Sequence, residues 1–198
     1  MNSNPVVIGI TGASGVIIAS HLVDEVLSKK IPVVLTASSA SRLVWNDEME
    51  ESFGEALERW HDTDKFKFYN PGELSAPIAS GTFPTRGMAI IPCSMATTSA
   101  ISSGLSDNLL RRAADVTLKE KRPLIILPRE TPLNDIHLSN MASLSRSGAT
   151  ILPVDPPFYL KLKTVDEIIS FIVQRILVAM KINDSLPIAM QYRGPRYD

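Results

Sequence analysis

Short apolar runs alternate along this chain with segments whose apolar residues recur at helical spacing. The apolar runs predict buried strands at 6–10, 32–36, 88–91, 124–127 and 150–153, and the alternation at 66–69 predicts an edge strand. The helical spacing predicts helices over 16–27, from about 40, over 52–67, after Ser94, and over 108–121, 134–147 and 165–180. Strands that alternate with helices in this way predict an α/β fold, a doubly wound parallel sheet in a three-layer αβα sandwich.

The length of the chain favours one domain. A chain of 198 residues can bury one sizeable α/β core but is short for two. We therefore expect a single domain over residues 1–182. Residues 183–198 form a tail that prolines interrupt and that is basic at Arg193 and Arg196. Two alternatives remain open for this tail: it covers a neighbouring subunit, or it is disordered.

Composition and charge exclude several classes of protein. The net charge of −1 and the pI of about 6.3 give no overall basic field that would recruit nucleic acid. The single cysteine excludes an internal disulfide and a cysteine-based metal cluster, and it fits a reducing cytoplasm. Three scattered histidines make a zinc site improbable, so no metal is expected. No apolar run reaches the roughly 18–20 residues of a membrane span, so we expect none.

Hydroxyl groups and glycines follow several of the predicted strands. The segment Thr11-Gly12-Ala13-Ser14-Gly15 follows the first strand, Ser38 follows the second, and Ser94 to Thr98 follow the strand at 88–91. Ligands of doubly wound sheets bind at the carboxyl ends of the strands, where turn amides and helix N-termini favour an anion. The glycine turn is not G-x-G-x-x-G, and no acidic residue ends the second strand, so a dinucleotide is not indicated. A turn whose glycines serve packing alone is the alternative.

Charged residues also occur at a strand end and along one helix. Pro128-Arg129-Glu130-Thr131-Pro132 follows the apolar run at 124–127, so it is either part of a ligand site or an ordinary surface ion pair. Asp107 is expected to cap the helix at 108–121, on which Arg112 and Lys119 lie seven residues apart and share one face. That face is a solvated surface, a phosphate clamp or a subunit contact.

Three single residues and one acidic run need an explanation of their own. Cys93 has no histidine or second thiol nearby, which favours a buried structural thiol over a nucleophile. His137 lies among apolar residues, which favours a core histidine over a catalytic one. Arg175 lies within the apolar pattern of the last helix, where a charge needs a partner or a ligand. The acidic run at 47–51 is typical of a solvated helix, from which one member can turn toward a site.

From Val6 to Ile182 the chain resembles the flavin prenyltransferase family of the UbiX type, within the wider flavoprotein group that includes flavin-dependent cysteine decarboxylases. The Pro-Arg-Glu-Thr-Pro and Arg-Ala-Ala-Asp-Val segments are specific for this family, whereas the glycine turn alone is a weak signal. The matching segments are Thr11-Gly12-Ala13-Ser14-Gly15, Ala79-Ser80-Gly81, Pro92-Cys93-Ser94-Met95, Asp107-Asn108-Leu109, Arg112-Ala113-Ala114-Asp115-Val116, Leu118-Lys119-Glu120, Pro128-Arg129-Glu130-Thr131-Pro132, Ile136-His137-Leu138-Ser139-Asn140-Met141 and Phe158-Tyr159.

The resemblance implies a Rossmann-like, flavodoxin-type subunit that assembles into a homododecamer with its sites at subunit junctions. Members of the family bind FMN and join a dimethylallyl group from dimethylallyl phosphate to reduced FMN. The prenyl group bonds to a nitrogen of the central flavin ring and to the neighbouring ring carbon, which builds a fourth ring. The product, prenylated FMN, passes to UbiD-type decarboxylases. No metal is implied.

The resemblance also implies roles for individual residues. FMN would be held by Gly12, Ala13, Ser14, Ser38, Ser94, Met95, Ala96, Thr97 and Arg129. The phosphate of the prenyl donor would be held by Ser80, Gly81, Lys119, Arg129, Tyr159 and Arg175, with Arg112 contributed by a neighbouring subunit. Glu130 would manage the proton of the departing phosphate, and Glu48, with Ser14, the proton lost during ring closure. This chemistry needs cations that stabilise the leaving phosphate. It also needs a carboxylate beside them that can exchange a proton.

The sequence departs from the family pattern at two places, and two other functions stay open. Leu160 to Lys163 stand where relatives often have a proline, and Leu74 stands where some place an aromatic residue over the prenyl group. The first alternative function is a flavin-binding partner that stores or delivers the cofactor without chemistry of its own. The second is oxidative decarboxylation of a peptidyl cysteine, which would leave the phosphate-binding cations unexplained.

Overall fold

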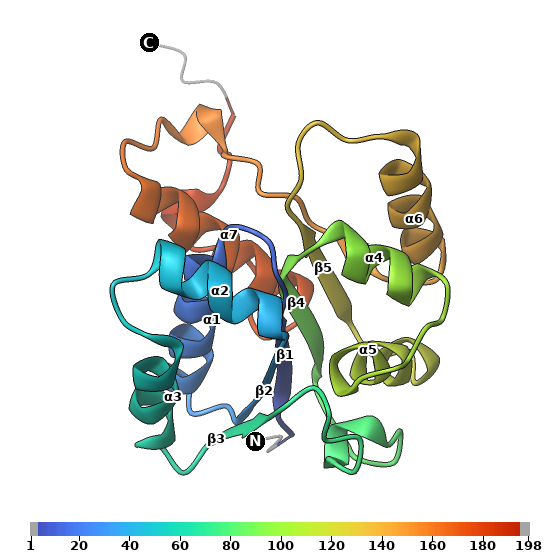
Figure 1. The fold of residues 1–198 in the computed structure, drawn as a ribbon. Helices are drawn as coiled ribbons and strands as arrows, with labels where there is room; N and C mark the ends of the chain where they lie inside the picture. Colours follow the sequence, from blue (N-terminus) through green and yellow to red (C-terminus); the bar gives the residue numbers. More distant parts are fainter. Residues whose placement is uncertain (1–3, 195–198) are drawn as a thin grey trace.

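A six-stranded parallel sheet forms the centre of the molecule in a computed structural model that describes residues 4–194 (Figure 1). The strand order is β3-β2-β1-β4-β5-β6, and every adjacent pair is parallel. The strands are β1 (Val6–Ile10), β2 (Val33–Ala37), β3 (Phe66–Tyr69), β4 (Gly87–Cys93), β5 (Leu124–Pro128) and β6 (Thr150–Ile151). The predicted doubly wound α/β sandwich is therefore confirmed.

Helices cover both faces of the sheet. They are α1 (Val16–Ser28), α2 (Ser39–Glu48), α3 (Phe53–His61), α4 (Met95–Ser102), α5 (Leu109–Lys119), α6 (Asp135–Arg146) and α7 (Val165–Ala179), with short 3-10 turns η1 (Pro77–Ala79), η2 (Phe158–Leu160) and η3 (Ile188–Met190). The helices α1, α2, α3 and α7 lie on one side of the sheet, and α4, α5 and α6 lie on the other (Figure 1).

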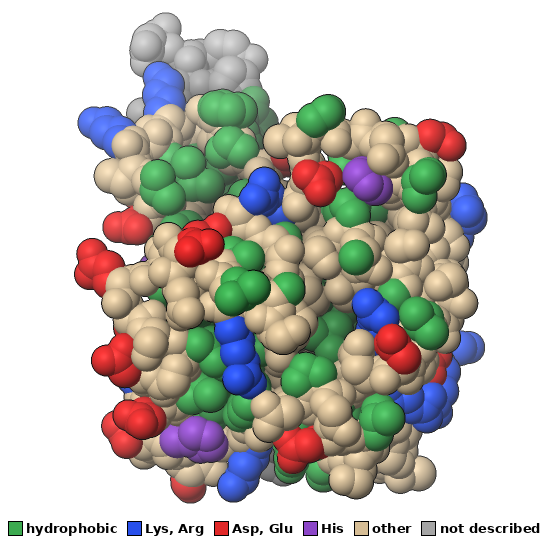
Figure 2. All heavy atoms as spheres, viewed as in Figure 1, with side chains coloured by type: hydrophobic (Ala, Val, Ile, Leu, Met, Phe, Trp, Pro, Cys, Tyr) green, Lys and Arg blue, Asp and Glu red, His purple; other side chains and the backbone are tan. Residues whose placement is uncertain are grey.

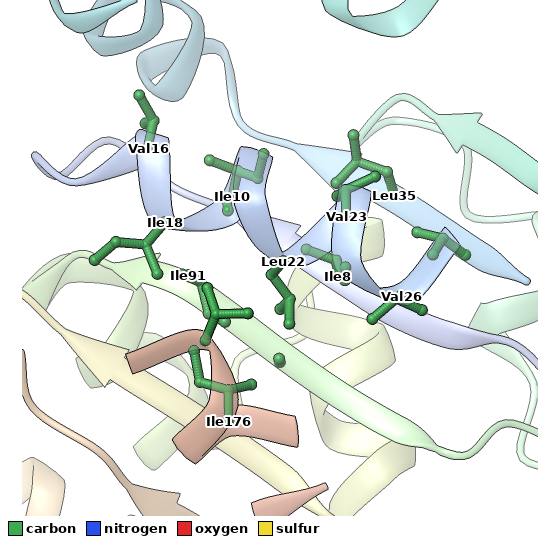
Figure 3. Packing of buried hydrophobic residues seen from close by; sticks show 14 of the residues in the cluster. Ile8, Ile10, Val16, Ile18, Leu22, Val23, Val26, Leu35, Ile91 and Ile176 are labelled. Carbon is green, nitrogen blue, oxygen red and sulfur yellow. The ribbon is translucent and has the colours of Figure 1, made fainter. Parts of the chain in front are cut away.

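Each face of the sheet has its own apolar core. Ile8 of β1 faces the α1 and α7 side, where Leu22 and Ile176 converge near Ile91 of β4 (Figure 3). The neighbouring residue Val7 faces the other side and packs in the cluster that includes α5. A central parallel strand is buried on both faces, which explains why these strands are continuous apolar runs in the sequence.

Three predicted boundaries were wrong. The helix predicted over 52–67 is shorter and corresponds to α3. A capping box between Ser52 and Glu55 sets its start, and the helix ends at His61. The cap of α5 is Asn108, whose side chain accepts from the amide of Arg111, whereas Asp107 was expected in that place. Asp107 instead forms an ion pair with Arg111. The last strand, β6, contains only two residues.

The described part of the tail packs on its own chain. Leu186 and Met190 contact the core beneath α7, and the Asn183 amide donates a 3.0 Å hydrogen bond to Gln174 of that helix. Residues 183–194 are therefore held against the domain, while Arg196 lies outside the described residues. Whether 1–182 is an independent domain remains a prediction. Within residues 4–194, no helix is long and apolar enough to cross a membrane.

Candidate functional site

The carboxyl ends of β1 and β4 are joined by one buried hydroxyl group. The side chain of Thr11 donates to the carbonyl of Pro92 at 2.9 Å and accepts from the amide of Ser94 at 2.7 Å. The strand order reverses direction between β1 and β4, and such a reversal is where a doubly wound sheet opens a crevice for a ligand. Thr11 therefore fixes the two turns on either side of that crevice, a role that the sequence analysis did not assign.

The glycine turn after β1 serves both packing and a charged partner. A Cβ at Gly12 would lie 2.5 Å from the Cβ of Ala40, so only glycine allows α2 to approach this closely. Gly15 has a φ of 103°, and its amide and that of Val16 donate to one carboxylate oxygen of Glu48 at 2.8 and 3.1 Å. Glu48 is the member of the acidic run whose carboxylate contacts the glycine turn that carries Ser14, although the residue itself remains exposed. Its neighbour Asp47 on α2 is exposed as well, and acidic side chains gather at the left of the face drawn in Figure 2.

The turn after β4 leaves backbone donors open. The hydroxyl of Ser94 caps α4 by accepting from the amide of Thr97 at 3.3 Å. The amides of Met95 and Ala96 have no acceptor within the part of the chain that the structure describes. The first amides of a helix need a partner and carry a positive partial charge, so this end of α4 is suited to an anionic or carbonyl-rich ligand.

A hollow of about 630 Å³ lies at the carboxyl end of β2. Its polar lining includes Ser38, Ser39, Asn70 and Asn108, and within residues 4–194 no acidic residue lines it. Arg42 also lines the hollow, with its guanidinium 5.4 Å from the ring centre of Phe53 and hydrogen-bonded to Asn70. The sequence analysis did not identify Arg42, although its place one turn after the cap Ser38 was a signal available there.

Arg129 and Glu130 lie exposed at the carboxyl end of β5, next to the β4 turn. The amide of Arg129 donates to the carbonyl of Cys93, and Glu130 accepts from the amide of Thr131. Within the described residues the two side chains form no ion pair with each other or with a third group. The surface ion pair considered for them is therefore wrong, and both charges remain available to a ligand.

A second group of site residues lies on the outer flank of α5. Arg112 donates to the carbonyl of Ala79 at 3.1 Å, and a Cβ on Gly81 would lie 2.5 Å from the ammonium of Lys119. Arg112 and Lys119 therefore share one face, as predicted, and both approach the segment that carries Ser80. The Lys119 ammonium hydrogen-bonds Glu120 and holds the pKa of that carboxyl below its ordinary value.

A third group lies on the side of α7. Tyr159 belongs to η2 and is 55% exposed. Arg175 is also exposed, while its neighbour Ile176 is buried, so the prediction that Arg175 lies near the apolar face was wrong. A single chain thus presents the expected site residues in three places: the turns at the carboxyl ends of the strands, the flank of α5, and the segments η2 and α7 that carry Tyr159 and Arg175.

Cys93 is a buried thiol, and His137 takes part in a helix cap. Cys93 is fully buried, and burial raises the pKa of its thiol to about 12, which agrees with the structural thiol favoured from the sequence. His137 is only partly buried, which corrects the expected core histidine: its ring accepts from the amide of Asn134 and caps α6. No group of three potential metal ligands occurs within residues 4–194.

Comparison with known proteins identifies the family. The Flavoprotein family model matches residues 1–177. The flavin prenyltransferase UbiX of Halalkalibacterium halodurans is 46% identical over 187 residues, which are 90% of this chain and 89% of the relative. This chain belongs to the UbiX flavin prenyltransferase family. The resemblance described from the sequence is confirmed.

Solved structures of this UbiX family agree with the fold. The crystal structure of AnUbiX in complex with FMN and dimethylallyl pyrophosphate has a TM-score of 0.88 and 31% identity, with all of both chains covered. A dodecameric FMN-dependent UbiX-like decarboxylase from Escherichia coli O157:H7 has the same TM-score and 36% identity, covering 96% of this chain and all of that one. The predicted Rossmann-like, flavodoxin-type subunit is confirmed.

Proposed function

We propose that this protein is a flavin prenyltransferase that joins the dimethylallyl group of dimethylallyl phosphate to reduced FMN. The observation that carries the proposal is the full-length similarity to AnUbiX, a structure that holds FMN and dimethylallyl pyrophosphate together. The convergence of the turns after β1, β2, β4 and β5 on one sheet edge supports it, because these turns carry the residues expected to hold FMN.

The donor groups of the sheet edge fit FMN. The open amides of Met95 and Ala96 and the hydroxyl groups of Ser94 and Thr97 suit the phosphate and the polar atoms of the flavin, and Arg129 adds a positive charge. The α1 end is less suited to the phosphate, since the Glu48 carboxylate already accepts from its amides. Reduced FMN, when bound, supplies the nucleophilic ring atoms that receive the prenyl group.

The cations are proposed to hold the phosphate of the prenyl donor. When the allylic C–O bond breaks, the electron pair leaves with the phosphate, so that Arg and Lys side chains around it stabilise the developing charge. Arg129 lies at the sheet edge, Tyr159 and Arg175 lie on the α7 side, and Ser80, Gly81, Arg112 and Lys119 lie on the α5 flank. A homo-oligomer in which the α5 flank of one subunit faces the sheet edge of the next would complete the site, and a dodecamer like that of the E. coli protein is our proposal.

Two carboxylates are proposed to move protons. Glu130 is unpaired beside Arg129, which suits a group that exchanges a proton with the departing phosphate. Glu48 is fixed by two backbone amides beside Ser14, which suits a base that accepts the proton lost at ring closure. We further propose that a UbiD-type decarboxylase receives the product, that the enzyme is located in the cytoplasm, and that the reaction needs no metal ion.

The test is anaerobic incubation of the protein with reduced FMN and dimethylallyl phosphate, followed by the mass of the flavin. We expect a gain of one dimethylallyl group, and a roughly 100-fold slower reaction for Glu130→Gln with FMN binding retained. Binding of FMN without any prenyl adduct would instead support a flavin carrier. Release of carbon dioxide from a peptide that ends in cysteine would support the decarboxylase alternative.

A further inference from the structure

The ring of Tyr159 contacts a second tyrosine from the C-terminal tail. The rings of Tyr159 and Tyr192 lie edge to face, with their centres 5.6 Å apart and their planes at 83°. Such a T-shaped pair is a favourable aromatic geometry, because the positive edge of one ring meets the negative face of the other. The contact joins residues 33 positions apart, in two segments that both pack against the same apolar core.

Little else fixes the side chain of Tyr159. It is 55% exposed, and within residues 4–194 its phenol hydroxyl has no hydrogen-bond partner. The segment that carries it is anchored on one side by Leu160 and Leu162, which pack against the core. The backbone position of η2 is therefore set by the core, whereas the direction of the Tyr159 ring depends on what packs beside it.

Tyr192 is itself held in place by the residues before it. Leu186 and Met190 pack against the same core cluster, and Gln191 donates a 2.6 Å hydrogen bond from its side chain to the carbonyl of Leu186. This closes the chain into a short loop around η3 that presents Tyr192, 68% exposed, toward η2. The backbone that carries Tyr192 is thus anchored to the domain, although it lies in the part of the chain for which the resemblance offered no match.

We propose that Tyr192 is a positioning residue for the prenyl donor, since its ring fixes the ring of Tyr159 and so directs the Tyr159 hydroxyl at the donor phosphate. The inference rests on the proposed function, in which Tyr159 binds that phosphate. It gives the tail a task in donor binding within its own subunit. Because the Tyr159 side chain is already oriented, it loses less conformational entropy when the donor binds. The tail therefore raises the affinity for the donor without contacting it.

The experiment compares Tyr192→Ala with Tyr192→Phe in the steady-state reaction. Alanine removes the ring, and we expect the KM for dimethylallyl phosphate to rise about 5-fold, within the range of one aromatic contact, with the KM for FMN unchanged. Phenylalanine keeps the ring edge and should restore the wild-type KM, because the proposal uses no hydroxyl of Tyr192. Ile188→Ala is the matched control, since Ile188 is exposed in the same tail and belongs to no ring pair.

Three results would overturn the proposed role of Tyr192. An unchanged KM for the donor in Tyr192→Ala overturns the inference, and so does a Tyr192→Phe variant that behaves like alanine. An equal rise for Ile188→Ala also overturns it, because the effect would then be a general disturbance of the tail. If Tyr192→Ala fails to fold, the Tyr192→Leu variant at matched thermal midpoint replaces it. A wild-type protein that forms no prenyl adduct contradicts the proposed function instead, and FMN binding in the same samples separates the two failures.

Discussion

The N-termini of α1 and α4 follow the same local plan but have different partners. Each helix follows a central strand and a short polar turn, and the two turns are joined by Thr11. Helix α1 has no side-chain cap of its own, and its first amides donate to Glu48, which comes from the end of α2. Helix α4 is capped within its own turn by Ser94, and this leaves two amides open.

This difference distinguishes the position proposed for catalysis from the position proposed for binding. A carboxylate at a helix N-terminus is stabilised by the amides and by the helix dipole, so α1 holds Glu48 in a fixed place beside Ser14. The same physics at α4 remains available to an incoming ligand. The glycine-rich turn, which suggests a phosphate loop in the sequence, thus holds a carboxylate of its own chain. We therefore propose the hydroxyl-rich turn at α4 as the place of the flavin phosphate.

The largest expected effect comes from changing Glu48, the carboxylate that accepts from the first amides of α1. In Glu48→Gln the amide oxygen can still accept from Gly15 and Val16, but the side chain can no longer take a proton. We expect the rate of prenylation to fall about 100-fold, equivalent to about 2.7 kcal/mol, while FMN binding and the thermal midpoint change little. The rate is measured by the appearance of prenylated flavin under single-turnover conditions.

Asp47→Asn provides the control, because Asp47 is an exposed neighbour on the same helix. It should leave the rate unchanged. A Glu48→Gln enzyme that keeps half of the wild-type rate would show that this carboxylate only caps α1.

A smaller effect is expected from cutting the link between the two turns. In Thr11→Val the amide of Ser94 loses its acceptor in a buried place, and we expect the free energy of unfolding to fall by about 2 kcal/mol. Thr36→Val is matched in shape and burial, but the hydroxyl of Thr36 is buried without a partner, so its loss should be neutral or stabilising. Urea unfolding of both apo-proteins measures the difference. Equal destabilisation by both changes would contradict a specific role for Thr11.

The sequence predicted the layers of the fold well because buried parallel strands have a local signature. Val6 to Ile10 and Leu124 to Leu127 are apolar runs whose meaning does not depend on distant residues. The hydroxyl groups at Ser14 and Ser94 could be recognised for the same reason, since they directly follow such runs. The resemblance added roles for residues that no periodicity identifies, such as Ser80 and Tyr159.

The parts that could not be predicted depend on contacts between distant segments. Which acid of the run 47–51 contacts the glycine turn is decided by the two amides of that turn, 32 and 33 residues away. The contact of Tyr159 with Tyr192 depends on the packing of the tail, for which hydropathy gives no signal. His137 was assigned to the core because Ile136 and Leu138 flank it, yet both are exposed on α6. Apolar neighbours in the sequence therefore do not distinguish a buried residue from one on an exposed helix face.

The smallest effect is expected at the open end of α4. In Ser94→Ala the helix loses its cap, which costs about 1 kcal/mol of stability, and the flavin loses one hydroxyl. We expect the Kd for FMN to rise about 5-fold. Ser52→Ala removes the cap of α3, a helix that carries none of the residues expected to hold FMN, and should lower stability by a similar amount with no change in FMN binding. Fluorescence titration of FMN against both variants compares them directly. If Ser52→Ala weakens FMN binding as much as Ser94→Ala does, the loss follows from stability alone and α4 has no special place in binding the flavin.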